Sequence, residues 1–128
     1  MRSLRSRVGV LAVTCLLSLG LAACGGGDDG GDTGADVEAD VSVTGTDALK
    51  FEPTELSAEA GTIAIGLTSE PSVEHNVVIE ETGDTMVVEA AGGQTNVGEV
   101  DLEAGTYTFY CSIPGHRVAG MEGTLTVS

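Results

Sequence analysis

From residue 37 onward, the sequence consists of short apolar runs in which hydrophobic side chains recur at every second position. In the run GTIAIGL, for example, Ile63, Ile65 and Leu67 fall on one side of an extended chain. This period is typical of β-strands, and the three-to-four spacing of an amphipathic helix is missing. Seven or eight such runs, separated by Gly, Asp, Glu and Pro, predict an all-β domain that is a sandwich or a small barrel.

The expected strands share short length and alternating hydrophobicity, and they cover residues 37–43, 48–51, 61–67, 72–79, 85–89, 95–100, 106–111 and 123–127. The chain has no Trp and only two Phe and two Tyr, so the core has to consist mainly of Val, Ile, Leu and Ala. Met86, in the run TMVVEA, is expected to lie in that core.

The segment that precedes this domain has the pattern of an export signal. Three arginines within the first seven residues are followed by the apolar run VGVLAVTCLLSLGLAA. The segment ends in LAAC, which resembles a bacterial lipobox, and the resemblance implies cleavage before Cys24 and a lipid on its sulfur. A plain secretory signal with a chance cysteine is the alternative. Either signal predicts export, and the lipobox predicts a lipoprotein at the outer face of the cell membrane or in the periplasm.

A polar segment lies between the signal and the domain. It reads CGGGDDGGDTGAD and contains no apolar residue that could anchor a core, which predicts a flexible tether. We therefore expect three parts: a lipoprotein signal peptide over residues 1–23, a Gly/Asp-rich tether over 24–36 and the folded domain over 37–128.

Charged residues are distributed unevenly along the chain. Three of the five basic residues precede Cys24, whereas all 20 acidic residues follow it, so two basic against 20 acidic side chains give the chain after cleavage a formal net charge of −18. We expect no nucleic acid partner, and we expect contact with the membrane only through lipid on Cys24. The charge favours a partner with a basic docking face, or it serves solubility alone. We expect a monomer.

Three segments each direct one soft metal ligand toward the interior, near the end of a strand. The residues in phase are His75 with Val77 and Ile79, Cys111 with Phe109, and Met121 with Leu125. His116 lies in the loop between Cys111 and Met121. After loss of the signal and lipidation of Cys24, Cys111 is the one cysteine left, and a lone thiol in an oxidising compartment needs a partner.

Taken singly, each of these residues has an ordinary explanation. A core histidine, a small buried thiol, a core methionine and a loop histidine would account for His75, Cys111, Met121 and His116. Together they place both histidines of the chain and its remaining thiol where one metal could be shared. Two His and one Cys, with a Met at longer range, are the ligands typical of a blue-copper centre.

With these residues, the segment 37–128 resembles a cupredoxin of the plastocyanin and azurin superfamily. The resemblance rests on His75 followed by Asn76 on a central strand, and on Cys111, His116 and Met121 around the C-terminal loop. The C-x4-H-x4-M spacing differs from that of plastocyanin and of azurin, and it is similar to that of rusticyanin, auracyanin and the sulfocyanins.

The resemblance implies a Greek-key β-sandwich with one mononuclear type 1 copper. The imidazoles of His75 and His116 and the thiolate of Cys111 would bind the metal, with Met121 as a weak axial ligand. Asn76 would tie the His75 segment to the Cys111 loop. The family resemblance further implies that the protein is not an enzyme and carries single electrons between redox partners, with the exposed ring edge of His116 as the route.

Three other interpretations remain open at this stage. Two His and one Cys with a vacancy for water would also suit a catalytic zinc site of a hydrolase, although Met121 argues against it and no acidic residue has the context of a general base. The domain could instead capture copper and deliver it to an exported or membrane cuproenzyme, although such sites gather more Met or His. A metal-free scaffold would leave the ligand set unexplained.

Overall fold

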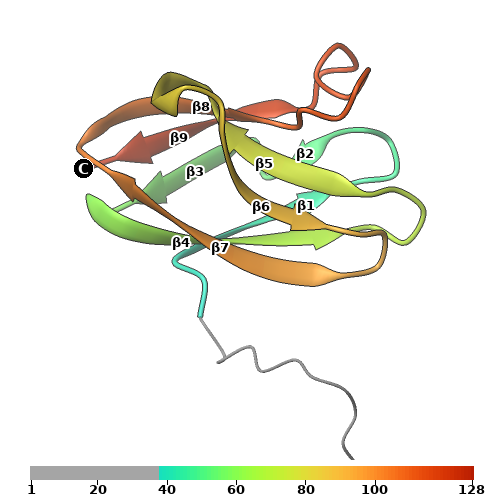
Figure 1. Ribbon diagram of the computed structural model, residues 1–128, viewed down its shortest axis with the longest axis horizontal. Helices are drawn as coiled ribbons and strands as arrows, with labels where there is room; N and C mark the ends of the chain where they lie inside the picture. Colours follow the sequence, from blue (N-terminus) through green and yellow to red (C-terminus); the bar gives the residue numbers. More distant parts are fainter. Residues whose placement is uncertain (1–37) are drawn as a thin grey trace, which may run out of the picture. The chain divides into compact units, whose positions relative to one another are not determined.

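The computed structural model describes residues 38–128, which form two β-sheets packed face to face (Figure 1). The expected signal peptide, Cys24 and the tether lie outside the described residues, and so does the first residue of the expected domain. Among the residues described, no helix is long and apolar enough to cross a membrane.

Four strands form one sheet and five form the other. In spatial order the first sheet contains β2 (Phe51–Glu52), β1 (Val41–Gly45), β4 (Gly61–Ser69) and β7 (Thr95–Leu102). The second contains β3 (Glu55–Ala58), β9 (Glu122–Val127), β8 (Gly105–Tyr110), β5 (His75–Ile79) and β6 (Thr85–Ala90). The β1–β4 and β3–β9 pairs are parallel and the other neighbours are antiparallel. A single turn of 3₁₀ helix, η1 (Glu80–Thr82), follows β5.

The predicted all-β sandwich is confirmed, with nine strands in the described residues instead of seven or eight. The strand that the pattern missed is β3, whose sequence ELSA carries a single strongly apolar residue, Leu56. Its backbone is extended because it pairs in parallel with β9, where Leu56 lies opposite Leu125. This edge strand therefore depends on a distant partner and has no clear local signal.

Inward side chains of both sheets form the core. Ile63, Ile65 and Leu67 of β4 are at most 1% exposed, as the alternation predicted. The rings of Phe51 and Phe109, which come from different sheets, lie 5.3 Å apart between their centroids. The remaining core is almost entirely aliphatic, in agreement with the composition.

The prediction that Met86 is a core residue is wrong. Its side chain is 55% exposed. The register between β5 and β6 shifts by one residue, so that Val77 pairs with Val88 while Val78 pairs with Met86. The extra residue, Val87, forms a bulge that reverses the phase of β6, and Met86 consequently faces solvent.

Candidate metal centre

Strand ends converge at one end of the sandwich. Figure 1 shows the orange-red connection between β8 and β9 at the same end as the start of β5. His75 is the first residue of β5, Cys111 directly follows β8, and Met121 directly precedes β9. Because β8 and β9 are antiparallel, Cys111 lies opposite Met121, and the Cys111 N–H donates to the Met121 carbonyl oxygen at 3.1 Å.

The loop between these two strands folds back on itself. The His116 N–H donates to the Ile113 carbonyl oxygen at 3.0 Å, and the Met121 N–H donates to the His116 carbonyl oxygen at 3.1 Å. Gly115, directly before His116, has φ of 88°, a left-handed conformation that glycine adopts with little strain. This turn returns His116 toward Cys111.

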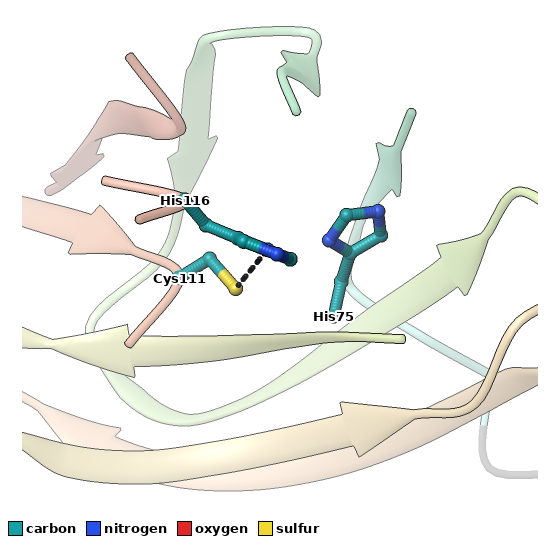
Figure 2. Close-up of side chains that lie close together, drawn as sticks. All are labelled: His75, Cys111 and His116. Carbon is teal, nitrogen blue, oxygen red and sulfur yellow. Dashed lines mark hydrogen bonds between the residues drawn. The ribbon is translucent and has the colours of Figure 1, made fainter. Parts of the chain in front are cut away.

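The side chains of His75, Cys111 and His116 meet in the interior. One ligand atom of each lies within 4.8 Å of those of the other two. The Cys111 sulfur is 3.4 Å from His116 Nδ1, and the ring centroids of the two histidines are 5.2 Å apart (Figure 2). His75 and Cys111 are fully buried, whereas His116 is 8% exposed. Met121 is also fully buried, in the strand end that borders the site.

His75 has two buried ring nitrogens and no hydrogen-bond partner for either of them. A buried polar group without a partner costs about 1–3 kcal/mol, so native proteins rarely leave one in place. Burial, and then the proximity of His116, lower the pKa of His75 below its ordinary value of 6.5. A neutral imidazole with a free lone pair, next to a thiol and a second imidazole, has the chemistry of a site for a soft or borderline metal ion.

The lowered pKa of His75 predicts that the metal-free protein becomes less stable in mild acid. Below about pH 6.5, the unfolded chain binds a proton at this residue that the folded domain excludes. We expect the free energy of unfolding, measured in urea, to fall as the pH decreases from about 7.5 to about 5.5. A His75→Gln variant, which cannot titrate there, should show a smaller decrease. Equal decreases in both proteins would contradict the prediction.

Gly45, at the end of β1, supports one face of His75. A Cβ atom at this position would lie 2.5 Å from Cδ2 and 2.7 Å from Cγ of the imidazole. These atoms belong to the ring, close to the backbone, and cannot move away without turning the whole side chain. Gly45 therefore allows the close approach of strand β1 that sets the ring orientation.

Asn76 connects the His75 strand to the residue that follows Cys111. Its Oδ1 accepts a hydrogen bond from the Ser112 N–H at 2.8 Å, and its Nδ2 donates to the Ser112 Oγ at 3.0 Å. The Asn76 side chain is 4% exposed whereas Ser112 is exposed, so these bonds are partly buried. They hold the β5 and β8 ends together beside the cluster.

Sequence patterns missed Gly45 and Ser112. Both act through residues about thirty or more positions away in the chain, and neither stands out within its own strand or loop. A local pattern holds no signal for such contacts.

Known proteins resemble this chain in sequence. A sequence model of the copper-binding proteins of the plastocyanin/azurin family matches residues 37–128. Auracyanin-A of Chloroflexus aurantiacus is 33% identical, over 95% of this chain and 97% of its own. Plastocyanin of Nostoc punctiforme is 33% identical, over 65% of this chain and 69% of its own. Auracyanin-B of Chloroflexus aurantiacus is 30% identical over 64% of this chain, which spans about half (48%) of that relative.

Solved structures show the same fold. The sodium dithionite-reduced auracyanin of Roseiflexus castenholzii superimposes with a TM-score of 0.57 at 21% sequence identity, covering 69% of this chain and 95% of that one. A structure of auracyanin B gives a TM-score of 0.56 at 23% identity, covering 70% of this chain and 90% of that one.

Proposed function

Because the chain belongs to the plastocyanin/azurin family of copper-binding proteins, we propose that it binds one type 1 copper ion and carries single electrons between redox proteins. His75, Cys111 and His116 are the three strong ligands in this proposal, and Met121 is a weak axial ligand. Members of this family, such as plastocyanin and the auracyanins, are electron carriers and not enzymes.

The observation that carries the proposal is the buried cluster of three donor groups without another role. The donor atoms lie within 4.8 Å of one another, and both nitrogens of His75 lack a hydrogen-bond partner. Two imidazoles and one thiolate are the strong ligand set of blue-copper sites. A coordinated metal would give one of the two His75 nitrogens a partner.

Bound copper would supply a one-electron couple between Cu(II) and Cu(I). The residues of the chain favour that exchange because the thiolate and thioether are soft, while the imidazoles suit both oxidation states. The hydrogen bonds of Asn76 to Ser112, and those between Cys111, Met121 and His116, hold the ligand segments in place. A firmly held ligand set changes little between oxidation states, which keeps the reorganisation energy low. His116, the most exposed of the three strong ligands, gives the shortest route to the surface.

The visible spectrum tests this function. Cu(II) is added to the metal-free protein produced from residue 25 onward, and the spectrum is recorded before and after reduction. Intense thiolate-to-copper absorption that disappears reversibly on reduction is the expected result. A protein that holds only colourless Cu(I) would favour copper delivery to a cuproenzyme, and preference for zinc over copper would favour a hydrolase.

Copper delivery stays the second candidate, because its ligands could be the same. The electron-transfer function is favoured by burial: all three clustered ligands are at most 8% exposed, whereas a site that hands over its metal has to open to a partner. Met86 is exposed on strand β6, where it pairs with Val78.

We further propose that the chain is an exported lipoprotein, with residues 1–23 as signal peptide, lipid on Cys24, residues 24–36 as tether and residues 37–128 as a monomeric copper domain. The LAAC ending and the Gly/Asp-rich composition support this arrangement. A Cys24→Ala variant should appear in the soluble fraction of cells, whereas the unchanged protein should partition into detergent.

The acidic surface favours redox partners with a basic face. The rate of electron transfer to such a partner should therefore fall as the ionic strength rises, and a rate that is indifferent to ionic strength would contradict this.

Replacing Met121 by Leu should leave copper bound and raise the reduction potential. Leu keeps an apolar side chain of similar volume but removes the thioether donor. Loss of a donor destabilises Cu(II) more than Cu(I), so we expect an upward shift on the order of 60 mV, which corresponds to a tenfold change in relative affinity. Cyclic voltammetry measures it, with Met86→Leu on the exposed face of β6 as the control. Complete loss of copper from the Met121→Leu variant would contradict a weak axial role.

A further inference from the structure

The described residues contain few basic side chains, and these gather at one place. In residues 38–128 the Lys and Arg residues are Lys50 and Arg117, against 16 acidic residues. The Lys50 ammonium donates to the carbonyl oxygen of Ala119. Arg117 belongs to the same segment, which we call the ligand loop and define as residues 111–121. Of the described basic side chains, one thus belongs to the loop that carries three of the proposed ligands, and the other contacts that loop.

Arg117 makes three contacts with its guanidinium group. Its Nη2 lies 2.7 Å from a carboxylate oxygen of Glu80, and its Nε lies 3.0 Å from one of Glu122. The central carbon of the guanidinium lies 4.1 Å from the centre of the Tyr110 ring. The Tyr110 hydroxyl donates in turn to Asp84 at 2.8 Å, which fixes the ring under the guanidinium.

Two of these partners are next to a proposed ligand, and the third follows the strand that begins with one. Tyr110 precedes Cys111, Glu122 follows Met121, and Arg117 itself follows His116. Glu80 directly follows β5, the strand that begins at His75. The Arg117 side chain therefore links the residues next to Cys111 and Met121 to its own position next to His116, and ties all three to the end of β5 opposite His75.

The middle of the ligand loop, residues 114–120, has backbone hydrogen bonds of its own but packs little apolar surface against the rest of the domain. Of residues 114–120, only His116 is buried, and Val118 is 94% exposed. A loop that buries so little apolar surface opens easily unless polar contacts restrain it. The guanidinium suits this task because its rigid plane can stack on a ring and donate along two edges at once, which a lysine ammonium cannot do.

We propose that Arg117 is a positioning residue, whose contacts with Tyr110, Glu80 and Glu122 hold the ligand loop closed and keep His116 and Met121 in register with Cys111. The relevance of this clamp to copper rests on the function proposed above. The closure of the loop is a property of the metal-free protein as well, so it can be measured whether or not copper binds.

The experiment compares the unchanged protein with R117Q, R117K and the double variant R117Q/E122Q. The double variant restores the net charge of the unchanged protein but lacks the guanidinium. Amide hydrogen exchange of Met121, whose N–H donates to His116, reports loop opening in the metal-free proteins. Copper release to a chelator and the reduction potential report the loaded site. Urea unfolding of each variant checks that the fold is retained.

Three contacts of ordinary surface strength together correspond to about a tenfold effect. We expect R117Q to accelerate Met121 exchange and copper release about tenfold and to shift the potential. Because the unfolded chain also lacks these contacts, the equilibrium constant of global unfolding should increase by the same factor, about tenfold, while the protein stays folded in water. The double variant should behave like R117Q, because the clamp and not the net charge is lost. R117K, which keeps one charged donor, should show an intermediate acceleration and serves as the second test if R117Q folds poorly.

Exchange at Met121 within about twofold of the unchanged protein in R117Q would overturn the proposal. Recovery of the original rates in R117Q/E122Q, or unchanged rates in R117K, would also overturn it, because charge alone would then be the cause. If neither the unchanged protein nor any variant binds copper, the proposed function is wrong. The exchange rates of the metal-free proteins still test the role of Arg117 in that case.

Discussion

Replacing Cys111 by Ser is expected to remove the intense visible absorption of the copper-loaded protein completely. The absorption of a blue-copper centre arises from charge transfer between the thiolate and Cu(II), and a serine hydroxyl cannot supply it. The Cys111 sulfur lies inside the buried cluster, 3.4 Å from His116 Nδ1. The other two groups of that cluster are imidazoles, so neither can replace the thiolate as a soft anionic ligand. We also expect Cu(II) to bind more weakly.

This result is informative because serine should preserve the fold. It is close to cysteine in size, and the backbone bond from residue 111 to the Met121 carbonyl does not involve the side chain. Urea unfolding of the metal-free variant serves as the control, since a colourless protein that is unfolded would say nothing about the ligand. A folded Cys111→Ser protein that keeps the blue colour would show that the thiol is not a ligand.

Replacing Gly45 by Ala should destabilise the metal-free domain and disturb the copper site together. The added Cβ would come within 2.5 Å of the His75 ring, so either the ring or strand β1 has to move. Overpacking of this kind in a well-packed interior costs about 1–3 kcal/mol. We expect a decrease of that size in the free energy of unfolding, measured in urea, and a weaker, shifted charge-transfer band after Cu(II) addition.

Gly105→Ala provides a matched control for this variant. A Cβ at Gly105 would approach the Tyr107 ring no closer than 3.5 Å, which is an ordinary contact. The substitution should therefore change both stability and spectrum little. Equal effects of Gly45→Ala and Gly105→Ala would show that the contact between strand β1 and His75 has no special importance.

The local pattern predicted most strands because their own residues alternate between apolar and polar side chains. Strand β4 is an example, since its buried Ile63, Ile65 and Leu67 follow the period of two. The pattern failed where a distant partner decides the conformation. Strand β3 exists through its pairing with β9, and Met86 faces solvent because a bulge against β5 shifts the phase of its strand.

The same division holds for the site. The residue types His, Cys, His and Met, and their positions near strand ends, were evident from the chain itself, because donor chemistry belongs to the side chain and the inward direction follows from the alternation. They suffice to predict a copper site. They do not reveal how close the donors come, nor which neighbours hold them.

Those features depend on contacts between segments far apart in the chain. The 4.8 Å cluster, the close approach of Gly45 to the His75 ring and the ion pair of Arg117 with Glu80 each join residues from different parts of the chain. Such contacts form only when the two sheets pack and the β8–β9 loop closes over the start of β5. The set of candidate ligands is therefore a local property of the sequence, whereas their mutual geometry and rigidity arise from packing across the described domain.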